Sequence, residues 1–409
     1  MLMLEQLDIF NFIDEKQNTY KIKNKIRLIE LFAGIGSQAK ALKRIGADFE
    51  HYKVVEFDKY AIASYNAIHN TNFTTQDITQ IKGNELEIIN TDKYTYIMTY
   101  SFPCQDLSLA GKQKGMSKGS STRSGLLWEV ERLLNETKEL PQILLMENVP
   151  QVHSNKNIVD FDKWIEFLQS KGYSNFWQDL NAKDYGIPQS RNRTFMVSIL
   201  GSYDYIFPKP FELKLRLKDM LEDEVDEKFY LSDTMISKIV LWKANQKPFE
   251  KVLGEKSVAP TLTARGAGEN HSGMILYGES LDDTTNLQEY CIKIKEATKK
   301  GYAEAGEGDG VYINRPHQKR GVVQKGMIQT IKTSPDVGVV VNKYSEKSPL
   351  RIRKLTPKEC WRLMGFDDED FEKASKSNTN TQLYKQAGNS IVVNVLEAIF
   401  KELLWKKQY

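Results

Sequence analysis

The stretch I-R-L-I-E-L-F-A-G-I-G-S, residues 26–37, sets a short apolar strand directly before a glycine-rich turn. Helical spacing follows from Gln38 to Ile45, so this segment predicts a strand, a turn and a helix. Further strand-like runs stand at 52–57, 94–100, 143–146 and 193–200, with a second helical run at 61–68. Such alternation is typical of an α/β fold, in which helices cover a parallel sheet and ligands bind at the carboxyl ends of the strands.

The sequence changes character after F-P-K-P-F at 207–211. From there to about residue 341 glycine, threonine and charged residues dominate, which predicts a smaller, loop-rich lobe. Helical sequence returns after Arg353 and ends with an apolar run at 391–404. We therefore expect an N-terminal extension at 1–24 and a main domain at 25–205, which a C-terminal helix at 382–409 completes. A second domain with a return segment is expected at 206–381.

The bulk composition is that of an ordinary globular protein. Hydrophobic residues make up 40% and charged residues 27% of the chain, and the net charge of +3 permits a nucleic-acid partner without requiring one. The three cysteines are far apart, which argues against a disulfide framework or a metal site and favours a reducing cytoplasm. Neither a secretory signal nor a membrane segment is expected, because the first residues lack a basic run and no apolar run reaches ~20 residues.

Cys104 stands in T-Y-S-F-P-C-Q-D-L-S, just after the strand-like run 94–100. An isolated cysteine is usually a small buried apolar residue. At the end of a strand, beside a proline and before a loop rich in glycine, serine and lysine, it instead suits a nucleophile.

The glycine turn and two acids predict a nucleoside-binding site. Gly34 lies in the turn, Glu56 follows by about 20 residues, and Asp77 stands in Q-D-I-T. An acid at the offset of Glu56 binds ribose hydroxyls in this class of fold, and Asp77 could bind an adenine amino group. The turn is not G-x-G-x-x-G and lacks a Walker lysine, so a pyrophosphate is not expected. Taken singly, a tight turn and helix capping would also explain these residues.

Glu147, in M-E-N-V, directly follows a buried strand, where an unpaired carboxylate is costly. Opposite a thiolate, such an acid could donate a hydrogen bond to the nitrogen of an electron-poor ring as sulfur adds. Arg191 and Arg193, in Q-S-R-N-R, are alternate residues beside a strand and could both face this site. The alternative for the two arginines is a surface salt bridge.

Taken in order, these motifs resemble the DNA (cytosine-5)-methyltransferase family of bacterial and phage type. The resemblance rests on F-A-G-I-G, Glu56, D-I-T, F-P-C-Q, E-N-V, Q-S-R-N-R, R-K-L-T-P-K-E-C-W-R-L-M-G-F and Q-A-G-N-S. It implies a Rossmann-like methyltransferase domain with a smaller target-recognition domain, S-adenosylmethionine as cofactor, and a flipped cytosine in double-stranded DNA as substrate. A monomer is expected, and a cognate restriction endonuclease would act independently.

The resemblance also implies roles for individual residues. The catalytic residues would be Cys104, which adds to cytosine C6, Glu147 at N3 and the amino group, Arg193 at the base carbonyl, and Arg191 nearby. The cofactor pocket would be lined by Phe32, Ala33, Gly34, Gly36, Glu56, Phe57, Asp77, Ile78, Pro103, Leu126, Asn389 and Ser390. Two departures are modest: Ser37 stands where many relatives have glycine, and Phe57 where tryptophan is common.

Two basic stretches are candidates for contact with DNA. The segment 105–124 is expected to be a lid that closes over DNA, and it contributes Gln105, Ser108, Lys112, Lys114 and Arg123. The basic, polar run 317–333 resembles the family's recognition segment, with Gln318, Arg320, Lys325 and Thr330 as candidates.

Three alternatives stay open at this point. One is a cytosine-5 methyltransferase acting on transfer RNA, although that family keeps the region between Arg193 and Arg353 compact. Another is a DNA-binding protein of the same fold that has lost catalysis, against which the intact Cys104 and Glu147 argue. A thiol hydrolase would need a histidine base, and none of the five histidines stands in such a motif. The recognition sequence cannot be read from these residues.

Overall fold

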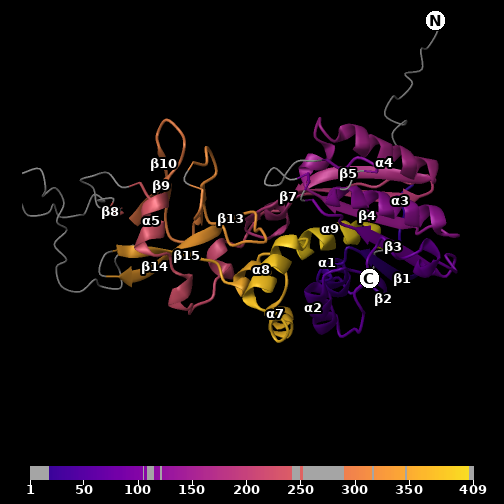
Figure 1. The fold of residues 1–409 in the computed structure, drawn as a ribbon, viewed down its shortest axis with the longest axis horizontal. Coiled ribbons are helices and arrows are strands. Elements are labelled where there is room, and N and C mark those ends of the chain that lie inside the picture. The colour runs from indigo at the N-terminus through magenta and orange to yellow at the C-terminus, as the bar shows by residue number, and fades with distance from the viewer. Residues whose placement is uncertain are drawn as a thin grey trace, which may run out of the picture.

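The computed structural model describes residues 18–104, 106–107, 115–119, 122–241, 249–251, 290–315, 317–345 and 348–404. They form two lobes, with a larger lobe of sheet and helices at the right of Figure 1 and a smaller, strand-rich lobe at the left. Over these ranges, no helix has the length and apolar character needed to cross a membrane.

The larger lobe is built on a six-stranded sheet in the order β2-β1-β3-β4-β7-β5. Its strands are β1 (Lys25–Leu31), β2 (Phe49–Val55), β3 (Tyr94–Tyr100), β4 (Ile143–Asn148), β5 (Tyr173–Asn181) and β7 (Asn192–Leu200). Strands β1 to β4 are parallel, whereas β7 is antiparallel to β4 and β5. The α/β class is confirmed, but the sheet is mixed. Only residues 182–191 link β5 to β7, and a parallel pairing needs a longer crossover.

Helices cover both faces of this sheet (Figure 1). The helices are α1 (Ser37–Arg44), α2 (Lys59–His69), α3 (Leu127–Glu136), α4 (Ile158–Ser170) and α9 (Val393–Leu403). One apolar cluster joins α1 and α9 to the face that carries Leu28, Ile97 and Leu145. A second joins α3 and α4 to the opposite face. Strand β4 is therefore buried on both sides, which explains its unbroken apolar start I-L-L-M.

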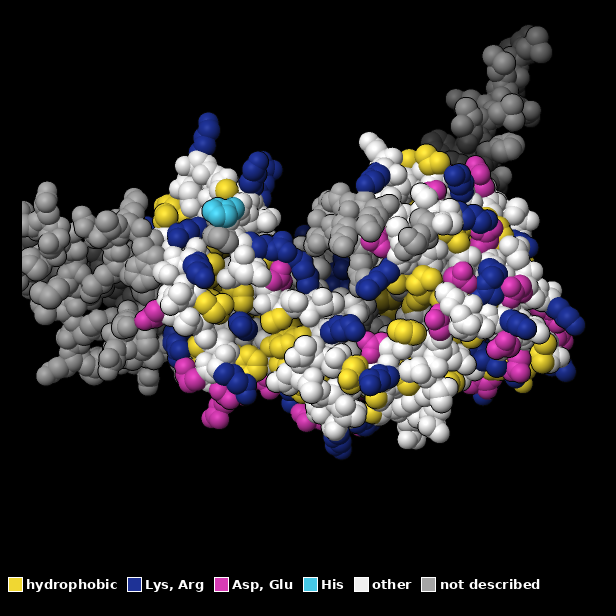
Figure 2. Space-filling view, viewed as in Figure 1, with side chains coloured by type: hydrophobic (Ala, Val, Ile, Leu, Met, Phe, Trp, Pro, Cys, Tyr) yellow, Lys and Arg dark blue, Asp and Glu magenta, His cyan; other side chains and the backbone are white. Residues whose placement is uncertain are grey.

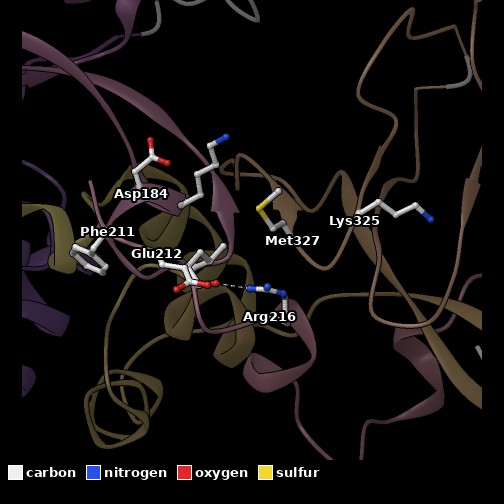
Figure 3. Close-up of a pocket in the computed structure, with 8 residues that line it drawn as sticks. Asp184, Phe211, Glu212, Arg216, Lys325 and Met327 are labelled. Carbon is white, nitrogen blue, oxygen red and sulfur yellow. Dashed lines mark hydrogen bonds between the residues drawn. The ribbon is translucent and has the colours of Figure 1, made fainter. Parts of the chain in front are cut away.

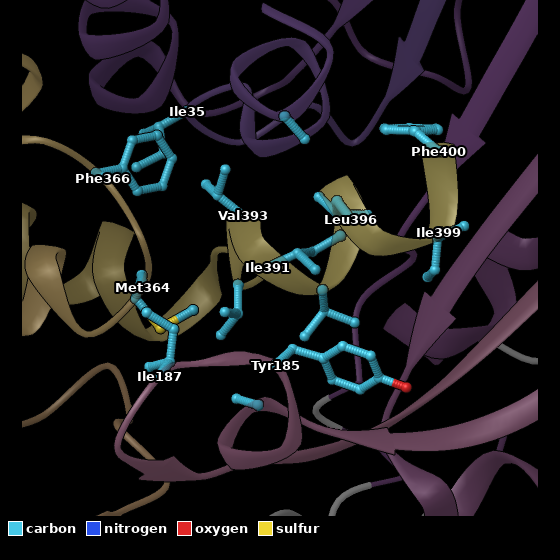
Figure 4. Packing of buried hydrophobic residues seen from close by; sticks show 14 of the residues in the cluster. Ile35, Tyr185, Ile187, Met364, Phe366, Ile391, Val393, Leu396, Ile399 and Phe400 are labelled. Carbon is cyan, nitrogen blue, oxygen red and sulfur yellow. The ribbon is translucent and has the colours of Figure 1, made fainter. Parts of the chain in front are cut away.

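Helix α9 crosses back over the larger lobe at the end of the chain. Figure 4 shows Val393, Leu396, Ile399 and Phe400 on this helix, with Tyr185 and Ile187 of the segment after β5 nearby. Burying a large apolar side chain contributes roughly 1.5–3 kcal/mol, so this packing fixes the C-terminal helix against the sheet.

The smaller lobe consists mainly of antiparallel strands. Strands β8 (Phe249–Lys251), β9 (Tyr290–Lys295) and β10 (Tyr302–Ala305) form one sheet, and α5 (Asp233–Ile239) precedes them. The second sheet contains β11 (Gly310–Tyr312), β12 (Val323–Gln324), β14 (Val337–Ser345) and β15 (Ser348–Lys354). Strand β13 (Ile328–Gln329) instead pairs with β6 (Gln189–Ser190), which belongs to the larger lobe.

Three helices follow the smaller lobe and lead to α9: α6 (Pro357–Arg362), α7 (Asp368–Ser375) and α8 (Asn380–Asn389). Helix α6 begins with a capping box between Thr356 and Glu359, and Pro357 stands in its first turn. Trp361 and Phe366 belong to the same apolar cluster as α1 and α9. The chain after β15 therefore packs against the larger lobe.

Candidate active site

The backbone that carries Cys104 is anchored on both of the residues before it. Asn148 Nδ2 donates to the Phe102 carbonyl at 2.9 Å, and Ser124 Oγ donates to the Pro103 carbonyl at 2.6 Å. The half-buried thiol therefore sits on a fixed turn at the carboxyl end of β3. Asn148 belongs to the E-N-V motif, so one short motif both supplies Glu147 and holds the F-P-C turn.

Glu147 and Arg193 form an ion pair on adjacent strands at this edge of the sheet. Arg193 Nε lies 3.1 Å from Glu147 Oε1, and both side chains are largely buried. Burial raises the pKa of the Glu147 carboxyl, while the charges of Arg193 and Arg191 oppose the rise. A raised pKa lets a buried acid keep its proton to a higher pH than an exposed carboxyl does, which suits a group that donates a hydrogen bond.

The electrostatics of Cys104 are set by the same groups. Burial, followed by the negative charge of Glu147, raises the pKa of the Cys104 thiol above its usual value, and Arg193 and Arg191 partly offset this rise. The thiol is therefore mostly protonated at neutral pH. Protonating or neutralising Glu147 would favour the thiolate, because it removes the like charge.

Arg191 makes contacts of a different kind. Its Nη1 donates to the Ile331 carbonyl at 2.9 Å, and its Nη2 donates to the carbonyls of Gly388 at 3.1 Å and Ser390 at 2.9 Å. Burial lowers the pKa of Arg191 to about 9, so it stays charged at neutral pH. That Arg191 faces the reacting base stays a prediction, because these hydrogen bonds of its guanidinium go to backbone carbonyls of other segments.

The glycine turn after β1 adopts left-handed backbone conformations. Phe32, Gly34 and Gly36 have φ values of 58°, 58° and 81°. For a bulky residue such as Phe32 this φ is a strained value, and such strain tends to occur at functional sites. An added Cβ at Gly36 would lie 2.2 Å from His69 Nε2, so only glycine fits there.

Glu56 ties this turn to the end of β2. Its Oε2 accepts from the Gly34 amide and its Oε1 from the Asp58 amide, each at 2.8 Å. Burial raises the pKa of Glu56, opposed by the hydrogen bonds from Asp58 and Gly34. The Glu56 carbonyl also accepts from the Gln76 amide, which brings the loop of Asp77 to the same edge.

The other predicted cofactor residues differ in exposure. Phe57 is 76% exposed, which leaves a ring face open beside Glu56. Asp77 accepts from the amide and hydroxyl of Thr79, as a capping residue would. Ala33, Ile78 and Ser390 are buried, Pro103 and Leu126 are half-buried, and Asn389 is exposed. The Ile391 amide donates to Ser37 Oγ at 3.3 Å, so Q-A-G-N-S lies against the glycine turn.

Three residues of this edge were missed from the sequence: Ser101, Ser124 and Asn148. Ser101 directly follows Tyr100, which pairs with Leu31 and with Met146, so its backbone leaves the sheet at the edge where β1, β3 and β4 end. Among the described residues, nothing hydrogen-bonds the buried Ser101 Oγ. Asn148 could have been found from the sequence, because it belongs to the E-N-V motif. No motif or residue pattern pointed to Ser101 or Ser124.

The predicted DNA residues that the structure describes lie on both lobes. Gln105, Ser108, Lys112 and Lys114 fall outside the described residues, and so does half of the proposed lid. Arg123 and Arg320 are exposed and Gln318 is half-buried. Exposed Lys325 pairs with Asp309 at 2.8 Å, and Thr330 Oγ1 donates to the Ser190 carbonyl at 2.7 Å. Figure 2 shows Lys and Arg side chains bordering the hollow between the lobes.

A cavity of about 470 Å³ lies where the lobes join (Figure 3). It is lined by Lys183, Asp184, Phe211, Glu212, Leu213, Arg216, Lys325 and Met327. None of the predicted catalytic or cofactor residues lines it, so it is separate from the strand-end site. No cluster of three or more potential metal ligands occurs in the part of the chain that the structure describes.

Comparison with known proteins places this geometry in a family. The C-5 cytosine-specific DNA methylase family matches residues 26–405. The chain is 32% identical to the type II methyltransferase M2.ScrFI of Lactococcus lactis subsp. cremoris, over 92% of this chain and 99% of the relative. It is 31% identical to the type II methyltransferase M.HhaI of Haemophilus parahaemolyticus, over 93% and 95%.

Solved structures agree on the fold. The Entamoeba histolytica methyltransferase EhMeth superposes with a TM-score of 0.58 at 16% identity, covering 93% of this chain and 98% of that one. The S. pombe Dnmt2 methyltransferase gives a TM-score of 0.56 at 18% identity, with the same coverage. The family match and the sequence relatives together confirm the resemblance, and the chain belongs to the C-5 cytosine-specific DNA methylase family.

Proposed function

We propose that this chain transfers a methyl group from S-adenosylmethionine to C5 of a cytosine flipped out of a specific double-stranded DNA sequence. The observation that carries the proposal is the grouping of Cys104 with the buried Glu147–Arg193 pair at one sheet edge. The family membership supports cytosine in DNA as the substrate.

The first step would be addition of Cys104 to the ring. The sulfur forms a bond to C6 of cytosine, and the C5–C6 π electrons shift toward N3 and C5. Glu147 would hold a proton at N3, so the ring gains no net charge as sulfur adds. A protonated Glu147 carries no negative charge, so it no longer raises the pKa of Cys104. A proton on Glu147 and a thiolate at Cys104 therefore favour each other.

The second step would be alkylation and release. When bound, S-adenosylmethionine would supply the methyl group as an electrophile and would leave as S-adenosylhomocysteine. C5 would form the new carbon–carbon bond and then lose its proton to water. The sulfur–C6 bond would break to release the Cys104 thiolate, and the N3 proton would return to Glu147, which restores the aromatic ring. Arg193 would hold the base carbonyl throughout, since its guanidinium is already fixed by Glu147.

The residues of the glycine turn suit this cofactor. The Glu56 carboxylate accepts hydrogen bonds from the amides of Gly34 and Asp58, which fix its position. A carboxylate fixed in this way could also accept hydrogen bonds from ribose hydroxyls. The exposed ring of Phe57 offers a stacking surface for adenine. The Ser101 Oγ atom is buried and has no hydrogen-bond partner among the described residues, so a bound ligand could satisfy it.

Reaching a base within a duplex requires extruding it, at a cost of a few kcal/mol. The hollow between the lobes, bordered by Lys and Arg side chains, suits a duplex (Figure 2). Arg320, Lys325 and the other recognition candidates would contact DNA from the smaller lobe.

The limits of the two domains also remain a proposal. Helices α6 to α8 fall mostly within the range 206–381 expected for the second domain, but their packing supports grouping these helices with the larger lobe.

Bisulfite sequencing tests the proposal directly. DNA from a methylation-free host that expresses the protein should carry 5-methylcytosine within one short sequence. Cys104→Ala should abolish the modification, whereas Cys291→Ala, in strand β9 of the smaller lobe, should retain it. Equal methylation by the Cys104→Ala variant would refute the assigned nucleophile. Modification of transfer RNA alone would support the RNA methyltransferase instead.

A further inference from the structure

Thr330 and Ile331 of the smaller lobe form hydrogen bonds with three consecutive residues of the larger lobe, 189–191. The Ile331 amide donates to Gln189 Oε1 at 3.1 Å, and the Ile331 carbonyl accepts from Arg191 at 2.9 Å. The Thr330 hydroxyl donates to the Ser190 carbonyl at 2.7 Å. We use the name recognition segment from here on for residues 328–333 alone, the last part of the basic run 317–333, because they contain the predicted DNA residue Thr330. Both backbone polar groups of Ile331 are thus satisfied by side chains of the other lobe.

The same two side chains also hold the end of the chain. Gln189 Nε2 donates to the Leu363 carbonyl at 2.7 Å, and Arg191 Nη2 donates to the carbonyls of Gly388 and Ser390. We name residues 386–390, Q-A-G-N-S, the closing segment. Gln189 and Arg191 therefore each bridge the recognition segment to the chain that follows β15.

The closing segment also touches the recognition segment directly. A Cβ added at Gly388 would lie 2.3 Å from the carbonyl carbon of Lys332 and from the nitrogen of Thr333. Such a distance leaves no room for a side chain, so the two backbones are in contact only because residue 388 is glycine. A shift of one segment therefore displaces the other.

On its other side, the closing segment and the residue after it meet the starts of α1 and α2, the helices that follow the glycine turn and Glu56. The Ile391 amide donates to Ser37 at the end of the glycine turn, and Gln386 Nε2 donates to the Tyr60 carbonyl at 2.9 Å. A continuous set of hydrogen bonds thus runs from the glycine turn through the closing segment and Arg191 to Ile331.

The chemistry of Arg191 suits a bridge. It is 4% exposed and Gln189 is fully buried, so water does not compete for their hydrogen bonds. One guanidinium nitrogen, Nη1, bonds the carbonyl of Ile331, and the other, Nη2, bonds the carbonyls of Gly388 and Ser390. A lysine could keep the charge but would offer one ammonium group, which cannot span the same carbonyls.

We propose that Gln189 and Arg191 are positioning residues that couple cofactor binding to DNA recognition, because they fix the recognition segment to the chain that follows β15: Gln189 at Leu363, and Arg191 at the closing segment. The inference rests on the proposed function, because it assigns the glycine turn to the cofactor and residues 328–333 to DNA. It gives Arg191 a role that does not require contact with the flipped base.

The test compares three variants with the wild type. Arg191→Lys keeps the positive charge near Cys104 but loses the bridge, and Gln189→Met removes the amide at similar size. Arg44→Lys is the matched control: Arg44 also donates to a carbonyl after β15, that of Gly365, and it pairs with Glu397 rather than with the recognition segment. Thermal unfolding checks that each variant folds.

Two affinities are measured for each protein. Calorimetry gives the Kd for S-adenosylhomocysteine, and fluorescence anisotropy gives the Kd for a short duplex bearing the methylated sequence, with and without S-adenosylhomocysteine. The ratio of the two duplex affinities is the coupling factor. We expect Arg191→Lys and Gln189→Met to lower this factor about fivefold or more, with the S-adenosylhomocysteine affinity in the absence of DNA nearly unchanged. Arg44→Lys should keep the wild-type factor.

The outcomes separate this inference from the proposed function. A wild-type protein that binds neither ligand refutes the proposed function and the inference with it. If the wild type binds both, a coupling factor of one, or an unchanged factor in the folded variants, overturns only the inference. If Arg191→Lys does not fold, Gln189→Met alone decides.

Discussion

Glu30 provides a prediction whose size follows from its surroundings. This carboxyl is fully buried on β1, two residues before the strained Phe32. The Tyr65 hydroxyl donates to its Oε2 at 2.5 Å, and the Ala39 amide donates to its Oε1 at 3.3 Å. Burial raises the pKa of Glu30 from 4.5 to about 7, although both hydrogen bonds oppose the rise. The folded protein thus binds this proton more tightly than the unfolded chain does.

The sign follows from linkage. Between pH 4.5 and about 7 the folded state holds the Glu30 proton while the unfolded chain has released it, so stability falls as the pH rises. The gap between the two pKa values corresponds to about 3 kcal/mol. Burial lowers the pKa of His51 to about 4 and that of His69 to about 3, so these neighbours stay neutral over most of this window.

Glu30→Gln should remove this pH dependence. The amide cannot ionise, and it can still hydrogen-bond the Tyr65 hydroxyl. Urea unfolding of wild type and variant in steps from about pH 5 to 8 should show the variant gaining up to about 3 kcal/mol relative to wild type, with no further gain above pH 7. A difference between Glu30→Gln and wild type that stays constant over this pH range would refute the buried-acid argument.

Three further predictions concern the site. Glu56→Ala should weaken S-adenosylmethionine binding tenfold or more by calorimetry, since a hydrogen bond to a charged group contributes roughly 1.5–3 kcal/mol; unchanged affinity would count against the assignment. Glu147→Gln should speed alkylation of Cys104 by iodoacetamide at neutral pH, because the like charge that raises the thiol pKa is gone; slower alkylation would contradict this. The slope of log binding constant against log salt concentration, measured for a DNA duplex, should become shallower by about one in Arg320→Ala if Arg320 contacts a phosphate. Lys325→Ala should change this slope by less, because Lys325 already pairs with Asp309.

Much of the larger lobe could be predicted from local pattern. The strand expected at 94–100 is β3, and the helix expected at 61–68 lies within α2. These elements obey a single periodicity and end at a glycine turn, a proline or a polar loop. The antiparallel direction of β7 carries no such local signal, because it follows from the short connection to β5. The pairing of β13 with β6 was equally hidden, since it joins residues about 140 positions apart.

The candidate site shows the same division. Glu147 and Arg193 were each expected to face one site, and in the structure they form an ion pair, which the sequence did not predict. Ser124 was hidden because its role is a hydrogen bond to a carbonyl 21 residues earlier, which no residue type announces. Sequence therefore indicates the candidate reactive groups, whereas the groups that hold them in place become visible only when distant segments meet.

Arg191 marks the point where a periodicity argument stops. Alternate residues share a face only while the backbone is extended, and β7 begins at Asn192. The Arg191 amide donates to the Gln189 carbonyl at 3.0 Å, and the Gln189 amide donates to the Ile187 carbonyl at 2.7 Å. Two successive hydrogen bonds of this span turn the chain tightly. Arg193 can therefore meet Glu147 while Arg191 turns toward Ile331 and Ser390, so two arginines of one motif hold different parts of the molecule.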